Sequence, residues 1–231
     1  MVAPALGFLS VSGVAARTVT LGHLFTPTPP SCQAGYTVLV TGVASGRSYV
    51  VPKAGVITSW SFHDGVNPVA GLKLKVGHSG GSGTYKIIGE ATAGTQKANT
   101  VNTYKTHIAV KAGDLIGIYE DGGSCLSAGN ARDTFVYSVG DVLAGTTVPF
   151  HRGAAKFPVS ARVRLDCVVP NLKGKTLKAA KKALKAASCR LGKVRPKGHT
   201  GGKVKSQRPA AGKRLAPGAK VNIRLGERRR A

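Results

Sequence analysis

The sequence predicts a mainly β protein in two parts. An antiparallel β-sandwich or jelly roll is expected over residues 18–165, followed by a small α+β unit of one helix on three strands over residues 166–226. Two observations lead to this prediction. Residues 18–165 contain many short β-branched and aromatic runs separated by Gly, Pro, Asn and Asp, which is typical of sandwiches and jelly rolls. Residues 176–187 form a Lys, Ala and Leu stretch with a helical period. A chain of 231 residues can hold two ordinary domains.

In the first part, each predicted strand is a short run that ends at a turn signal. Residues 56–62 and 72–76 alternate apolar and polar side chains, so one face of each strand should be buried. The core candidates are Trp60, Phe62, Leu72, Leu74, Ile116 and Ile118. The predicted strands cover residues 36–42, 49–51, 56–62, 72–76, 85–88, 107–110, 115–119, 135–139 and 161–165.

Three segments of this part are similar to a domain of secreted actinobacterial proteins of unknown function. They are Val-Ile-Thr-Ser-Trp-Ser-Phe at 56–62, Leu-Lys-Leu-Lys-Val at 72–76, and Val-Lys-Ala-Gly-Asp-x-Ile-Gly-Ile-Tyr at 110–119. The resemblance covers about half of the chain. It implies a secreted β-sandwich with an unidentified ligand.

The second part begins near Asp166 with almost no linker. Thr176 is placed to cap a helix, and Leu177, Ala180, Leu184 and Ala187 recur at the spacing of one helix face. Lys178, Lys181, Lys182 and Lys185 fall on the opposite face. Strands are expected at residues 190–195, 203–207 and 221–225.

The order of motifs in this part resembles a PASTA module. Val-Val-Pro-Asn-Leu-x-Gly (168–174) precedes the helix, and Ser-Gln-Arg-Pro-Ala-Ala-Gly (206–212), Ala-Pro-Gly (216–218) and the strand 220–225 follow it. The resemblance implies an extracytoplasmic, non-catalytic module linked to peptidoglycan, of the kind attached to penicillin-binding proteins and bacterial Ser/Thr kinases. This copy departs from the pattern, because it stands alone and a basic residue replaces the usual acid early in the helix.

Charge is concentrated in the second part. The chain has a net charge of +25, and residues 167–231 carry 20 basic side chains against the single acid Glu227. Such a field favours anionic partners, so the candidate binding residues are Lys178, Lys181, Lys182, Lys185, Arg195 and Arg208. The lysines could equally form a solvated helix face. Charge-driven binding of nucleic acid is an alternative, although residues 167–231 lack the Phe, Tyr or Trp that would stack on bases.

Four cysteines, Cys32, Cys125, Cys167 and Cys189, allow three pairings. The most economical hypothesis pairs Cys32 with Cys125 and Cys167 with Cys189, within each part, and implies an oxidising compartment.

Residues 1–17 are expected to be a signal peptide truncated at its front or a disordered arm, because an apolar run lacks a preceding basic residue. Residues 227–231 form a basic tail. No stretch approaches the length of a transmembrane helix.

Enzyme-like patterns are few. Gly77-His78-Ser79-Gly80-Gly81 fits the Gly-x-Ser-x-Gly pattern of a nucleophile elbow, but a strand is expected after it where that motif needs a helix. Asp121 and Asp133 are weak candidates for a calcium site. The histidines lack metal-ligand spacing, so neither a metal nor a cofactor is expected.

We therefore expect a non-catalytic binding protein that is secreted or attached to the cell wall, with peptidoglycan or an anionic wall polymer as its partner. The alternatives are a nucleic-acid or polyanion binder, a purely structural extracellular module, and a wall-active enzyme delivered by the second part.

Overall fold

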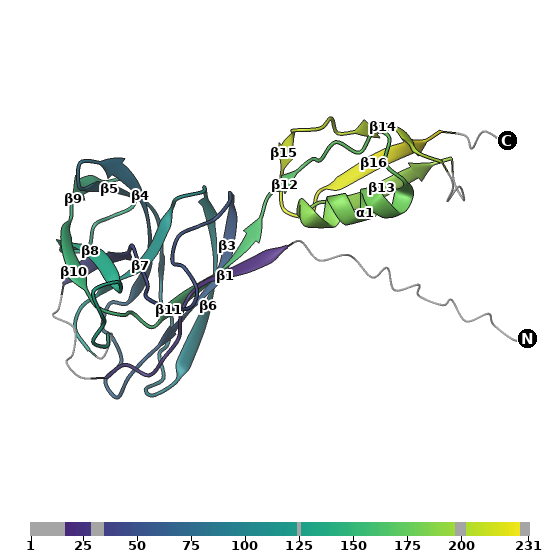
Figure 1. The fold of residues 1–231 in the computed structure, drawn as a ribbon. Helices are drawn as coiled ribbons and strands as arrows, with labels where there is room; N and C mark the ends of the chain where they lie inside the picture. Colours follow the sequence, from purple (N-terminus) through teal and green to yellow (C-terminus); the bar gives the residue numbers. More distant parts are fainter. Residues whose placement is uncertain (1–16, 29–34, 124–125, 197–201, 227–231) are drawn as a thin grey trace, which may run out of the picture. The chain divides into compact units, whose positions relative to one another are not determined.

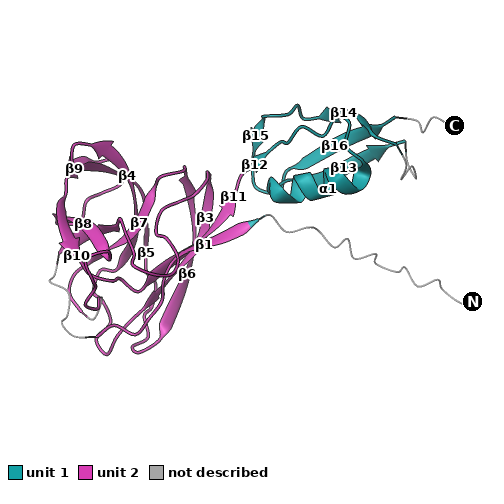
Figure 2. Ribbon diagram, in the orientation of Figure 1, with its two compact units in different colours: residues 1–17, 167–231 teal, residues 18–166 magenta. Residues whose placement is uncertain are grey.

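A computed structural model describes residues 17–28, 35–123, 126–196 and 202–226. The chain divides into two compact units (Figure 2). Thr18–Asp166 form the N-terminal unit, and the described residues from Cys167 onward form the C-terminal unit. The segment 1–16, the cysteines Cys32 and Cys125, and the tail 227–231 lie outside the described residues, so the predictions made for them stay predictions.

The N-terminal unit is an antiparallel sandwich of two sheets (Figure 1). One sheet has the order β1 (Thr18–Gly22), β11 (Val159–Leu165), β3 (Gly55–His63) and β6 (Val101–Val110). The other has the order β10 (His151–Ala154), β8 (Thr134–Val139), β2 (Tyr36–Val40), β7 (Leu115–Glu120), β4 (Lys73–Gly81), β5 (Thr84–Thr92) and β9 (Thr147–Pro149). The orders β1-β11-β3-β6 and β2-β7-β4-β5 are those of a jelly roll, and β8, β9 and β10 extend the second sheet.

The main core lies between the two sheets. All six predicted core residues are buried: Trp60, Phe62, Leu72, Leu74, Ile116 and Ile118. The strand predictions are confirmed except at residues 49–51, where Val50 forms only an isolated bridge to Leu115. Three short strands, β1, β9 and β10, were not predicted. β9 and β10 are short runs with few apolar residues, β1 has only Val19 and Leu21 as apolar residues, and pairing with longer neighbours defines all three.

A second, smaller core lies on the outer face of the seven-stranded sheet. It contains Leu39, Ile87, Leu115, Val136, Val142 and Phe150. The segment that leads from β8 to β9 is attached there through Thr37, whose hydroxyl donates to the Gly140 carbonyl (2.7 Å) and accepts from the Val142 amide (2.9 Å). This face is therefore covered by the chain itself.

A buried lysine completes that attachment. The Lys75 side chain has no exposed surface, and its Nζ donates to Glu90 Oε2 (2.5 Å), Asp141 Oδ1 (2.5 Å) and the Val142 carbonyl (3.0 Å). Lys73 also pairs with Asp141. Burial favours a higher pKa for the Asp141 carboxyl, but hydrogen bonds from Lys73 and Lys75 outweigh it and hold that pKa below its usual value.

The C-terminal unit packs one helix on one face of a three-stranded sheet (Figure 1). Helix α1 (Leu177–Ala186) places Ala180 and Leu184 against Val221, Ile223 and Leu225. The sheet order is β13 (Arg190–Arg195), β16 (Lys220–Leu225) and β14 (Val204–Arg208), with β13 parallel and β14 antiparallel to β16. β12 (Cys167–Val168) and β15 (Arg214–Leu215) form a separate short pair. The predicted helix and three strands are confirmed.

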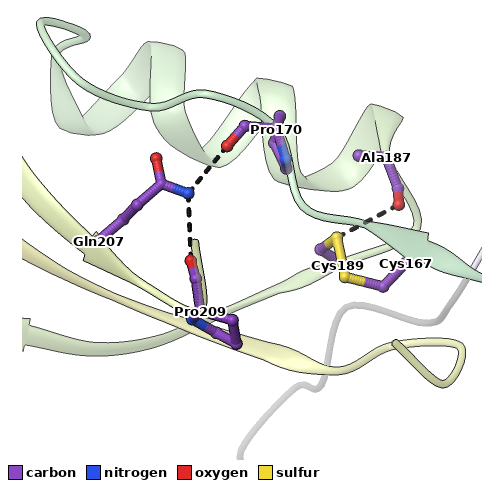
Figure 3. Close-up of a disulfide and its surroundings, with 6 residues drawn as sticks. All are labelled: Cys167, Pro170, Ala187, Cys189, Gln207 and Pro209. Atoms are coloured by element: carbon purple, nitrogen blue, oxygen red, sulfur yellow. Dashed lines mark hydrogen bonds between the residues drawn. A yellow bond between two sulfur atoms is a disulfide. The ribbon is translucent and has the colours of Figure 1, made fainter. Parts of the chain in front are cut away.

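Local contacts explain the motifs of this unit. Thr176 Oγ1 accepts from the Ala179 amide (3.3 Å) and caps α1 as predicted. Gln207 Nε2 donates to the Pro170 carbonyl (3.0 Å) (Figure 3). Gln207 Oε1 accepts from the Leu172 amide (2.7 Å). The glutamine of the second motif thus fixes the loop that carries the first.

The disulfide Cys167–Cys189 is present (Figure 3). It joins the strand before the helix to the strand region after it and closes a loop across a sequence separation of 22 residues. Described helices include none long and apolar enough to cross a membrane.

We expect the double substitution Cys167→Ser/Cys189→Ser to lower the free energy of unfolding of the C-terminal unit by about 3 kcal/mol, because the unfolded chain gains loop entropy. Hydrogen exchange of the β16 amides measures this, since Trp60 reports only on the other unit. The urea midpoint followed by Trp60 fluorescence is the internal control and should not move. Unchanged exchange in β16 would contradict the prediction.

We expect Lys75→Met to destabilise the N-terminal unit by about 3 kcal/mol, because it leaves the partly buried Glu90 without its cation and Asp141 with Lys73 alone. Lys73→Met is the matched control. Its side chain is 22% exposed and pairs with Asp141 alone, so about 1 kcal/mol or less should be lost. Urea unfolding followed by Trp60 fluorescence compares the two, and equal losses would show that the burial of Lys75 has no special effect.

Glu120 makes the N-terminal unit sensitive to pH. Its side chain is buried, and this desolvation raises its pKa from 4.5 to about 7, with a smaller raising effect from Asp121 and an opposing hydrogen bond from the Gly122 amide. Because the folded-state pKa lies above the unfolded value, the folded state loses stability as the pH rises from 4.5 through about 7.

We expect the wild-type protein to lose about 3 kcal/mol of unfolding free energy relative to Glu120→Gln between pH 4.5 and pH 8. Urea unfolding of both proteins at each pH measures the difference, and the comparison cancels the titration of Asp64 and Asp141. Parallel pH profiles for the two proteins would refute the assignment.

Candidate functional site

The described residues of the C-terminal unit carry many positive charges and no negative one. Residues 167–226 contain no Asp or Glu. The four ion pairs found among the described residues all lie in the N-terminal unit. No described Lys or Arg of residues 167–226 can therefore pair with a carboxylate of that range, and the strands and the helix determine where these cations lie.

Helix α1 carries one group of them. The predicted stripe Lys178, Lys181, Lys182 and Lys185 is exposed on the face opposite Ala180 and Leu184. Neighbours at these spacings repel one another, and the first turn has no acid to complement the helix dipole. The stripe is a row of separate ammonium groups on the convex surface of the helix. Their repulsion lowers the stability of the helix.

The outer face of the sheet carries the other group. Along β16, Val221, Ile223 and Leu225 point toward the helix, so Lys220, Asn222 and Arg224 point outward. Arg195 is the neighbour of Arg224 in β13, and Ser206 is its neighbour in β14. Arg208 lies beside Asn222. Cations from three strands thus converge on one surface. We call it the basic sheet face and define it as Lys193, Arg195, Arg208, Lys213, Lys220 and Arg224.

Asn222 shapes the centre of this face. Its Oδ1 accepts from the Lys193 amide (2.7 Å) at the irregularity where β13 shifts register against β16. A Cβ at Gly192 would lie 2.2 Å from that oxygen, so only glycine fits beside it. The asparagine therefore fixes the β13 backbone that carries Lys193 and Arg195, and its amide group faces the same surface.

The face is hollowed. A shallow, open depression of about 390 Å³ is lined by Lys193, Arg195, Ser206, Gln207, Arg208, Asn222, Ile223 and Arg224. A second one of about 640 Å³ shares Arg208 and Asn222 and extends to Lys213 and Lys220. No hydrogen bond from the side chain of any of the six cations is found within the described part of the chain. Beside Lys220, Arg190 has a buried Nε without a partner among the described residues.

The predicted binding residues thus separate into two sites. Lys178, Lys181, Lys182 and Lys185 lie on the helix, whereas Arg195 and Arg208 belong to the basic sheet face. Sequence analysis missed Lys193, Lys213, Lys220 and Arg224 as partners of the two arginines. The alternation of Lys220, Asn222 and Arg224 with buried residues was a usable signal, but only the strand order shows which neighbours join them.

The N-terminal unit has a smaller polar depression, of about 330 Å³, near His23, Phe25, Asp133 and Lys156. Burial and the nearby Arg47 lower the pKa of His23, whose Nε2 accepts from the Arg47 amide (2.6 Å). Hydrogen bonds from the Ala44 and Asn130 amides lower the pKa of Asp133. Lys156 Nζ lies 5.9 Å from the centre of the Phe25 ring. The Asp133 carboxylate is thus occupied by backbone amides.

The enzyme-like motif is part of a hairpin. Residues 77–81 belong to β4, and β5 follows directly after Ser82 and Gly83. Both turn residues have positive φ, as in a two-residue hairpin. His78 Nδ1 contacts Asp114 Oδ1 at 2.7 Å, but Ser79 follows His78 along the strand and points to the opposite face. This geometry is not that of a nucleophile elbow. Across the described residues, no group of His, Cys, Asp or Glu is arranged to hold a metal ion.

Comparison with known proteins identifies the C-terminal unit. The model of the PASTA domain family matches residues 168–227. No curated protein and no solved structure matches the chain. PASTA domains are non-catalytic binding modules of cell-envelope proteins. The motifs, the helix on its three-stranded sheet and the family match agree, and the chain is a PASTA domain-containing protein.

Proposed function

We propose that this protein is a non-catalytic binding protein of the cell envelope, located outside the cytoplasm. Its PASTA domain would associate with peptidoglycan, or with anionic polymers embedded in it, through lysine and arginine. The β-sandwich would present a second binding surface to a separate ligand.

The observation that carries the proposal is the uncompensated charge of the PASTA domain. A surface with cations and no acid attracts polyanions from a distance and holds them by charge. Retaining such a surface costs stability through self-repulsion. PASTA domains occur in proteins of the cell envelope, so anionic polymers of the wall are the partners that we propose for this surface.

Two further observations support an extracytoplasmic location. The disulfide Cys167–Cys189 stabilises a small domain, which is typical of proteins from oxidising compartments. The sandwich offers neither a nucleophile elbow nor a metal site within its described residues, so a binding role suits it better than a catalytic one. The depression near His23 and Lys156 is the candidate surface for its ligand.

We expect the full-length protein to sediment with purified cell walls at low salt and to be released as the salt concentration rises, because the interaction is electrostatic. A variant with glutamine at Lys178, Lys181, Arg195 and Arg208, taken from both faces of the PASTA domain, should lose at least about tenfold in affinity. The measurement is the bound fraction at a series of wall concentrations.

The matched control removes the same amount of charge from the sandwich. Glutamine replaces the exposed residues Lys53, Lys86, Lys97 and Lys105, and wall binding should change by less than about threefold. Equal losses in both variants would point to the net charge of the whole chain, and absence of pelleting at any salt concentration would refute wall association. Tighter binding to DNA than to walls would favour the nucleic-acid alternative.

A further inference from the structure

The two cationic faces of the PASTA domain differ in a way that points to one kind of ligand. The helix stripe consists of four lysines on a convex surface. The basic sheet face contains three arginines, Arg195, Arg208 and Arg224, around a hollow that also exposes Ser206 and Asn222. Guanidinium groups present paired donors that match the oxygens of phosphate or carboxylate, whereas an ammonium group acts as a point charge.

The cations of the sheet face are also in rows. Arg195 and Arg224 lie side by side in neighbouring strands, and Arg208 lies beside Asn222, one step further along β16. Lys220 follows at the next outward position, next to Arg190. Outward residues of a strand are about 7 Å apart, so the charged track along β16 extends over about 13 Å. The shape of this track fits a chain that lies along the sheet rather than a single small anion.

The spacing of the track matches a phosphodiester chain. Two residues of extended polypeptide span about six backbone bonds, as do two successive phosphorus atoms joined through a three-carbon polyol. A polymer of this kind can bring one phosphate to each step of β16. The hollow is open and shares residues with the second depression near Lys213 and Lys220, so such a chain can continue past the hollow at this end.

Nucleotide bases would gain little on this surface. Recognition of single-stranded nucleic acid relies on aromatic side chains that stack on the bases, and residues 167–226 contain no Phe, Tyr or Trp. Ile223 also lines the hollow but directs its side chain toward the helix, and Gln207 is engaged in hydrogen bonds to the loop at Pro170 and Leu172. The surface therefore favours the backbone charge of a polymer and offers its bases no partner.

We propose that the basic sheet face binds a linear phosphodiester polymer of the polyol-phosphate type, with Arg195, Arg208 and Arg224 as its phosphate contacts and the helix lysines contributing only long-range attraction. This inference deepens the proposed wall association and rests on it, since it names the polymer and the face.

The test uses the full-length protein and poly(glycerol phosphate) in solution. Arg195→Gln/Arg208→Gln/Arg224→Gln should weaken binding at least about tenfold and reduce the slope of log affinity against log salt by about 2. Lys178→Gln/Lys181→Gln/Lys185→Gln removes the same charge from the helix and should weaken binding by less than about threefold. Equal losses from the two faces would overturn the assignment. Hydrogen exchange in β16 verifies that both variants keep the fold.

Two further measurements test whether the arginines bind phosphate through paired donors and whether the polymer is a polyol phosphate. Arg195→Lys/Arg208→Lys/Arg224→Lys keeps the charge but removes the paired donors, so a loss of about fivefold is expected, and unchanged affinity would refute bidentate contacts. Oligothymidylate with the same number of phosphates should bind no tighter than poly(glycerol phosphate), and tenfold tighter binding would overturn the polyol assignment. Pelleting with walls stripped of phosphate polymers, without binding of poly(glycerol phosphate), would sink this inference and leave wall association standing.

Discussion

Mutual repulsion of like charges is the constraint that the fold of the PASTA domain has to overcome. Residues 167–226 contain no acid, so folding brings many cations together without an ion pair to offset them. Three features stabilise the fold against this repulsion. They are a small apolar core, the disulfide Cys167–Cys189, and the hydrogen bonds that Gln207 makes to the loop at Pro170 and Leu172. The side chain of Gln207 thus holds the Gln-x-Pro and Pro-Asn-Leu motifs together by hydrogen bonds, since residues 167–226 offer no ion pair for this purpose.

The same constraint arranges the surface. The inward positions of α1, β13, β14 and β16 form the core, and most of their outward positions carry polar residues. With no acids in the composition, both outer faces become cationic. In the sandwich, by contrast, two lysines are paired with carboxylates inside the unit. Lys73 and Lys75 are neutralised by Glu90 and Asp141, and they hold the chain segment that covers the second core. The sandwich thus pairs some of its charges internally, whereas the described cations of the PASTA domain have no carboxylate to pair with within residues 167–226.

The periodicity of apolar residues was sufficient to predict the helix and strands whose formation depends on nearby residues. The helix, its cap at Thr176 and the strands that carry the sandwich core are of this kind. Features set by long-range pairing could not be predicted. The neighbourhood of Arg195 and Arg224 depends on the parallel pairing of β13 with β16. Lys75 lies in an alternating strand whose polar face is usually solvated, and only the covering segment at Val142 makes it buried.

The proposed binding of a polyanion would be coupled to the folding of this domain. A polyanion that neutralises the basic sheet face removes part of the repulsion that opposes the fold, and a ligand that binds only the native state stabilises it further by mass action. The sheet face gains more from this coupling than the helix stripe does. Its cations come from β13, β14 and β16 and from the loop before β15, and are distant in sequence, so they approach one another only when the sheet forms. The helix lysines are neighbours in any helical state of residues 177–186. Ligand contacts on the sheet face therefore require the complete domain, whereas those on the helix do not.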